Sequence, residues 1–272
     1  MPFRHAHWWV LLLFPVAALA FWPQYLSTLA TSPASYHVHG ITASLWLLLL
    51  AAQSWSIHNN HRAFHRSTGL VSLALFPLFL AGGAAIFIGM AERFVEAATP
   101  FYQLWPPRLA WLDFVAIGGM AYFYFMALKH RRKVGAHSSY LLATAIFLLP
   151  PILGRLAPLP LGIDFSQPGA FEQLGLAFHL GNVATAVIAF TIAARAGRNG
   201  RPFVVAGLLS LLATLLFEIP GGTEAWRSLY VHAAMIPLAP MAAAAALAGA
   251  AIGWAGWNAG KRKSPGAGSL PA

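Results

Sequence analysis

Residues 67–91 read STGLVSLALFPLFLAGGAAIFIGMA, a run of 25 residues that contains no charged side chain. A membrane-spanning helix needs about 20 consecutive apolar residues, because each residue adds about 1.5 Å against a hydrocarbon core about 30 Å thick. The run therefore predicts a helix that crosses a lipid bilayer.

The composition of the whole chain is typical of a membrane protein. Of its 272 residues, 58% are hydrophobic and only 9% are charged, whereas an ordinary soluble domain has about 25% charged residues. The high apolar content excludes a disordered chain. The chain has no cysteine, which excludes a disulfide scaffold, thiolate chemistry and iron–sulfur clusters held by cysteine.

Similar apolar segments recur along the chain and predict an all-α, polytopic membrane helix bundle with about eight transmembrane helices in a single domain, residues 1–260. The segments lie at residues 8–30, 38–57, 67–91, 109–128, 138–160, 172–194, 203–220 and 230–257. Pro237 and Pro240 are expected to kink the last segment. Residues 261–272 are rich in Gly, Pro and Ser and are predicted to form a disordered cytoplasmic tail.

Charge alternates between the two sides of the predicted bundle. One side carries only basic residues, namely Arg4, Arg62, Arg66, Lys129, Arg131, Arg132, Lys133, Arg195, Arg198, Arg201, Lys261, Arg262 and Lys263, while all 7 acidic residues fall on the other. Lys and Arg collect on the cytoplasmic side of membrane proteins, so both termini are predicted to be cytoplasmic, in the inner membrane of a bacterium. This face accounts for the net charge of +10 and is expected to attract anionic lipid rather than nucleic acid.

The N-terminal segment has an alternative interpretation as a cleaved signal peptide, because Arg4 precedes an apolar run that reaches Ala18-Leu19-Ala20. The apolar run continues to Leu29, which is longer than a typical signal sequence. We therefore expect a retained helix.

Eleven histidines are the most distinctive feature of the polar residues. Most of them lie where predicted helices begin, and there the helix dipole favours the neutral imidazole that ligates a metal or a haem. The candidate ligands for a cofactor are His39, His179 and His232 on the outer side and His65 and His137 on the inner side. Contact with lipid headgroups is the alternative role for each of them.

Other polar side chains are predicted to line an internal cavity. His39, Thr42, Trp46 and Gln53 share one face of their helix, since their spacing follows the helical period. Asn182 lies one turn after His179. Polar groups within a membrane must face protein, water or a cofactor, so Thr42, Trp46, Gln53, Asn182 and Arg155 are expected to face such a cavity. Hydrogen bonds between helices are the alternative for Thr42 and Gln53.

Several motifs resemble those of a group of uncharacterised bacterial multi-span membrane proteins that are rich in histidine. They are Phe21-Trp22-Pro23-Gln24-Tyr25, His37-Val38-His39-Gly40 with Trp46 and Gln53, His65-Arg66-Ser67-Thr68-Gly69, and the stretch from His137 to Arg155. The resemblance covers residues 20–160 and implies no particular activity. Paired histidines near both membrane faces are also similar in architecture to cytochrome b561-type proteins, which implies two haems.

Three functions follow from these residues as alternatives. In the first, His39 with His179 or His232, and His65 with His137, ligate haem b and pass electrons across the membrane. In the second, His39, His179 and His232, with Asp113 or Glu218, bind Zn, Cu or Fe in a membrane enzyme.

The third function is transport of a small solute, a proton or a lipid past Asp113, Glu218, Asn182 and Gln53. A small apolar substrate or a quinone is an expected partner in a protein of this kind. A scaffold whose histidines carry out no chemistry is the remaining alternative.

Overall fold

A computed structural model describes residues 3–261, and every regular element in that range is helical. Seven helical segments are long and apolar enough to cross a membrane: α2 (Ala34–His58), α3 (Arg62–Val95), α5 (Pro106–Lys129), the segment Val134–Leu161, α9 (Leu174–Ala196), α10 (Arg201–Glu218) and α12 (Leu238–Ala259). The prediction of an all-α polytopic bundle is confirmed. Apart from Lys261, the predicted tail at 261–272 lies outside the described residues.

The first apolar segment differs from its prediction, because the helix is shorter than the apolar run. Helix α1 (Ala6–Phe21) has 16 residues, which is about 24 Å at 1.5 Å per residue. A turn at residues 22–25 and a 3-10 segment, Leu26–Thr31, follow it. Helix α1 is therefore an eighth apolar helix that is shorter than a full span.

Prolines divide two of the predicted segments. Residues 138–160 fall in α6 (Val134–Ala143), a 3-10 segment (Thr144–Leu148), and α7 (Leu149–Leu156), with α8 (Pro158–Leu161) directly after it. Before the last span, α11 (Glu224–Tyr230) and a 3-10 segment (Val231–Met235) end ahead of Pro237, so α12 begins at Leu238. Proline removes a backbone donor and clashes with the preceding turn, so it ends a helix as well as kinking one.

The long helices form a ring of neighbours. In the order α1, α2, α3, α12, α5, α10, α9, α7, each helix contacts the next one, and α7 contacts α1. The 3-10 segment Thr144–Leu148 lies inside this ring, where it contacts α2, α5 and α10 and residues 144–147 are buried.

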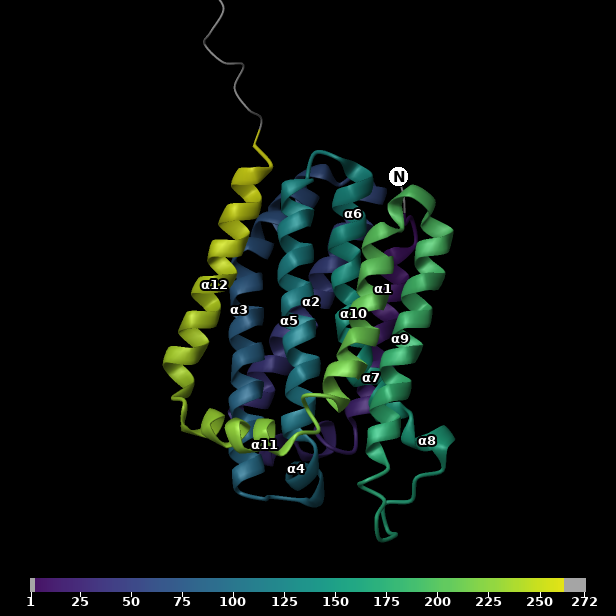
Figure 1. The fold of residues 1–272 in the computed structure, drawn as a ribbon. Coiled ribbons are helices and arrows are strands. Elements are labelled where there is room, and N and C mark those ends of the chain that lie inside the picture. The colour runs from purple at the N-terminus through teal and green to yellow at the C-terminus, as the bar shows by residue number, and fades with distance from the viewer. Residues whose placement is uncertain (1–2, 262–272) are drawn as a thin grey trace, which may run out of the picture.

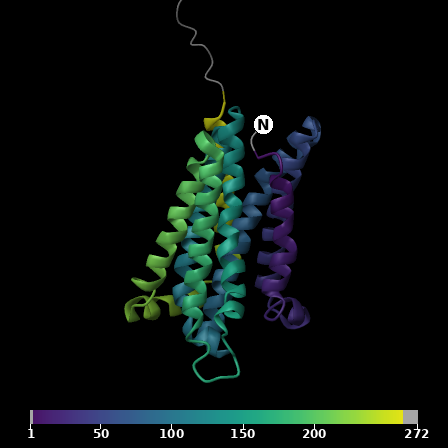
Figure 2. The ribbon, with the colours of Figure 1, turned by 90° about the vertical axis from the view of Figure 1, so that its right-hand side faces the viewer.

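Both ends of the described chain lie at the same end of the bundle, together with the loops α5–α6 and α9–α10 (Figure 1). Figure 2 shows α1 along one side of the bundle and confirms that the chain begins at the end where α12 finishes. The opposite end carries α8, α11 and the short helix α4 (Pro100–Leu104). We call the end with the termini the inner end and the opposite one the outer end.

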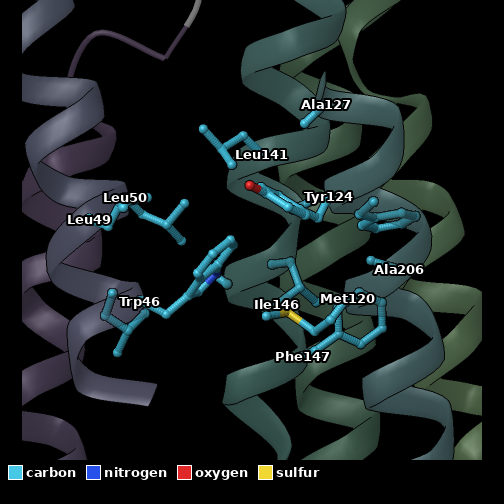
Figure 3. Packing of buried hydrophobic residues seen from close by; sticks show 14 of the residues in the cluster. Trp46, Leu49, Leu50, Met120, Tyr124, Ala127, Leu141, Ile146, Phe147 and Ala206 are labelled. Carbon is cyan, nitrogen blue, oxygen red and sulfur yellow. The ribbon is translucent and has the colours of Figure 1, made fainter. Parts of the chain in front are cut away.

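The main core lies where α2 faces α5 and α6 (Figure 3). Trp46 of α2 is completely buried and packs against Phe76 and Tyr124, with ring centroids 5.5 and 5.4 Å apart. Its indole nitrogen donates a hydrogen bond of 3.0 Å to Thr144 Oγ1. This contact ties α2 to the 3-10 segment in the middle of the bundle.

Candidate functional site

A cavity of about 370 Å³ opens between α2, α3, α5, α6 and α12 near the inner end. Its size falls within the range of about 300–1,000 Å³ that is usual for small-molecule sites. Apolar side chains make up more than half of its lining residues, and Leu49, Leu50, Tyr124 and Leu141 face one another across this region in Figure 3. An apolar molecule therefore matches most of the wall.

Two of the predicted ligands, His65 and His137, line this cavity together. His65 stands near the start of α3, and His137 stands in the first turn of α6. The structure thus brings the predicted inner histidine pair to one site.

The hydrogen bonds of these two histidines fix the same tautomer. His65 Nδ1 lies 3.2 Å from the Gln53 carbonyl oxygen, and His137 Nδ1 lies 2.9 Å from the Ala127 carbonyl oxygen. A carbonyl only accepts hydrogen bonds, so each Nδ1 carries the proton and each neutral ring keeps its lone pair on Nε2. Within residues 3–261, the hydrogen bonds of both rings involve Nδ1 only, and neither Nε2 atom has a partner. Both lone pairs are free to bind a ligand.

Gln53, one of the predicted cavity residues, holds the start of α3 in place. Its side-chain amide donates to the His65 carbonyl oxygen at 2.8 Å and to the hydroxyl of Thr68. Its own backbone carbonyl accepts from the His65 ring. Gln53 therefore orients His65 through both its backbone and its side chain.

Two arginines give the inner mouth of this cavity a positive charge. Arg66 is exposed. Arg131 lies 4.3 Å over the Trp257 ring and donates to the Trp257 carbonyl oxygen at 2.6 Å. Burial, with Arg132 nearby, lowers the pKa of Arg131. The site combines two imidazoles, an apolar wall and two cations.

A second group of polar residues lies toward the outer end, and we call it the outer cluster: Tyr36, His39, Arg93, Tyr102, Asp113 and Arg155. The hydroxyls of Tyr36 and Tyr102 are 2.8 Å apart, and Arg93 stacks over the Tyr102 ring at 5.2 Å. Arg155 and Asp113 are close enough for their opposite charges to attract, and Tyr36, Tyr102 and His39 lie within range of the Arg155 charge. Burial and the charge of Asp113 raise the pKa of Tyr230, which lies in α11 beside the cluster.

The outer histidines do not converge. His179 Nε2 bonds to Glu218 Oε1 at 2.7 Å, and the other oxygen of Glu218 accepts from Arg108 at 2.9 Å. His232 is exposed in the segment before α12, while His39 packs against α3 near Phe79.

The predicted metal site of His39, His179 and His232 with Asp113 or Glu218 is therefore not formed. Within residues 3–261, no group of three or more His, Cys, Asp or Glu side chains is placed to hold a metal ion. The reason is the order of the ring, because α9 packs on α7 and α10 whereas α2 packs on α1 and α3. The same separation leaves His39 without a histidine partner for the predicted outer haem.

The remaining predicted cavity residues are dispersed. Thr42 donates to the Val38 carbonyl oxygen of its own helix at 2.8 Å, and Trp46 belongs to the core. Asn182 is buried and donates to the Phe178 carbonyl oxygen at 3.1 Å. Only Gln53 of this set lines the inner cavity, and Arg155 belongs to the outer cluster.

Some residues of both sites did not stand out in the sequence. Arg66, Arg131 and His58 line the inner cavity, although their basic surroundings in the sequence are typical of a solvated loop. Tyr36 and Tyr102 resemble ordinary interfacial tyrosines. Arg93 is one of several arginines near helix ends, and only the fold brings it to the Tyr36–Tyr102 pair.

Comparisons with protein-family models, with curated proteins and with solved structures find no match to this chain. Its function is therefore inferred from the geometry of its own residues.

Proposed function

We propose that this chain is a redox protein of a bacterial cytoplasmic membrane and that it binds one b-type haem between His65 and His137. The observation that carries the proposal is the shared tautomer of these histidines, since both line one cavity, hold the Nδ1 proton on a backbone carbonyl and leave the Nε2 lone pair without a hydrogen-bond partner in the described chain. A backbone acceptor on Nδ1 is the usual support of a metal-ligating histidine. The bound iron would accept and donate single electrons.

The rest of the cavity fits this cofactor. A macrocycle needs apolar contact on both faces, which the leucines, Tyr124 and Trp257 of the wall provide. Its two propionates need cations, and Arg66 and Arg131 are at the inner mouth. Because only the inner histidine pair meets, we propose one haem instead of the two that the resemblance to cytochrome b561-type proteins implies.

The orientation of the bundle belongs to the same proposal. Within the described range, the inner end carries basic residues and no acidic ones. By the positive-inside rule this end faces the cytoplasm. The haem would then lie near the cytoplasmic side, and an anionic bilayer surface would contact its edge.

The test is an absorption spectrum of the protein purified in detergent, before and after reduction with dithionite, with iron measured on the same sample. We expect a Soret band that shifts on reduction and about one iron per chain. His65→Ala and His137→Ala should each lose the low-spin spectrum. His232→Ala is the matched control, because His232 is exposed at the opposite end, and its spectrum should be that of the wild type.

A protein that stays colourless after expression with haem precursor, and that gives no such band when haemin is added, would contradict the proposal. A spectrum that survives in both His65→Ala and His137→Ala would place the haem elsewhere.

A further inference from the structure

The guanidinium of Arg155 lies within the membrane-spanning part of the bundle without a contacting counter-ion. It is six residues before the outer end of its span, about 9 Å along the helix axis. Its Nη1 donates to the Pro151 carbonyl oxygen at 3.0 Å, and the group lies 4.4 Å over the Phe21 ring. Its Nε is buried without a hydrogen-bond partner, and no carboxylate of residues 3–261 contacts it within 4.0 Å.

Arg93 of the outer cluster also lacks a contacting counter-ion among the described residues. Its Nε is also buried without a partner in the described chain, and it forms no ion pair there. It stacks on Tyr102, whose hydroxyl meets that of Tyr36. The Tyr36 hydroxyl also donates to Met90 Sδ at 3.4 Å, so Tyr102 donates to Tyr36 and both hydroxyl protons are used.

The half-buried arginines of the outer cluster are not paired with acidic side chains of the described chain. Arg93 and Arg155 contribute two positive charges, and Asp113 is the one acid that interacts electrostatically with Arg155. Glu92 and Glu96, near Arg93 in the sequence, are exposed. Neither arginine contacts a carboxylate of the described residues within 4.0 Å. An unpaired charge within a membrane-spanning segment is costly, so a negative group that contacts Arg155 would stabilise the folded protein.

We propose that the outer cluster binds a monoanionic group, a carboxylate or a phosphodiester, between Arg155 and Arg93. Such a group accepts hydrogen bonds from N–H groups of the two guanidiniums. Arginine matches both groups, because its planar fork fits two oxygens at once. Asp113 faces the same region and disfavours any ligand with a second negative charge.

The monoanion can come from a lipid headgroup or from a soluble carboxylate, and the experiment separates the two sources. The full chain is purified in a neutral detergent, and its melting temperature is measured with phosphatidylglycerol, with zwitterionic phosphatidylcholine, and with sodium butyrate. A ligand that binds the folded state raises the melting temperature. We expect phosphatidylglycerol or butyrate to stabilise the wild type, and phosphatidylcholine to have a smaller effect.

Variants show whether the effect belongs to the outer cluster. Arg155→Gln should lose more than half of the rise, and native mass spectrometry should then find one fewer phosphatidylglycerol bound if lipid is the source. Arg108→Gln is the matched control, because Arg108 lies at the same end but already pairs with Glu218, and it should keep the full rise. Lipid bound to the basic inner end stabilises both variants equally and cancels in this comparison.

If Arg155→Gln does not fold, Arg155→Lys replaces it, because lysine keeps the charge and removes the Nε donor. An equal rise in the wild type and in the Arg155 variant, or no rise with either anion, would overturn the proposal.

Discussion

The hydroxyl of Thr144 satisfies the most deeply buried indole of the molecule. Trp46 and Thr144 are both completely buried, and the Trp46 nitrogen donates to the Thr144 oxygen at 3.0 Å. Thr144→Val keeps the shape of the side chain but leaves the indole N–H without an acceptor. We expect the free energy of unfolding to fall by about 1–3 kcal/mol, measured by thermal or denaturant unfolding in detergent.

Thr191→Val is the matched control for this prediction. Thr191 is exposed on α9, and its hydroxyl donates to the Val187 carbonyl oxygen of its own helix. We expect its stability to change by no more than about 0.5 kcal/mol. Equal effects of the two substitutions would show that the buried hydrogen bond does not contribute to stability.

At the level of single residues, the sequence allowed the inner site to be predicted better than the outer one. His65 and His137 begin predicted helices after basic loops, so the topology alone puts both at the same membrane depth. The outer cluster depends on which helices are neighbours. Hydropathy identifies the spans but does not indicate which of them pack together. For that reason the sequence predicted His179 or His232 as the partner of His39, whereas α2 and α9 lie in different parts of the ring and His232 is exposed.

Helix α12 packs through a row of glycines rather than through large side chains. Its buried residues are Gly249, Gly253 and Gly256, and a Cβ atom at Gly249 would lie 2.8 Å from Pro77 Cα of α3. Small residues at such a seam let two backbones approach closely. Because the obstacle is backbone, Gly249→Ala should separate α12 from α3 and lower the free energy of unfolding by about 1–3 kcal/mol.

Gly118→Ala provides the comparison for this substitution. Gly118 lies in α5, and a Cβ atom there would meet no atom within 4 Å. Alanine favours a helix over glycine by about 1 kcal/mol, so this variant should be as stable as the wild type or more stable in the same melting experiment. A stable Gly249→Ala protein would mean that α12 does not pack closely on α3.

The lengths of the spans followed from hydropathy, but the breaks within them did not. An apolar segment of this length fits one continuous helix and two helices joined by a 3-10 turn equally well. Pro150 and Pro151 lie at the start of α7, where proline is tolerated. The break before them places Thr144 in the centre of the bundle, which is a tertiary outcome that a local pattern does not contain.

The described residues have a simple distribution of charge between the two ends of the bundle, which predicts the side of the membrane for each proposed site. The chain has no cysteine, so single cysteines can report the topology without background labelling. Arg132→Cys and Arg198→Cys place exposed reporters in the inner loops, and Glu96→Cys and Glu172→Cys place them at the outer end.

A membrane-impermeant maleimide applied to intact spheroplasts should label the two outer positions and should reach the two inner positions only after the membrane is permeabilised. The physical reason is the positive-inside rule, since the described inner loops carry Lys and Arg without acid. Labelling after permeabilisation is the internal control for each variant, because it shows that the protein is present and the thiol reactive. The reverse pattern would put the His65–His137 cavity on the outside and the outer cluster on the cytoplasmic side. In that case the anionic ligand of Arg155 would have to come from the cytoplasmic leaflet.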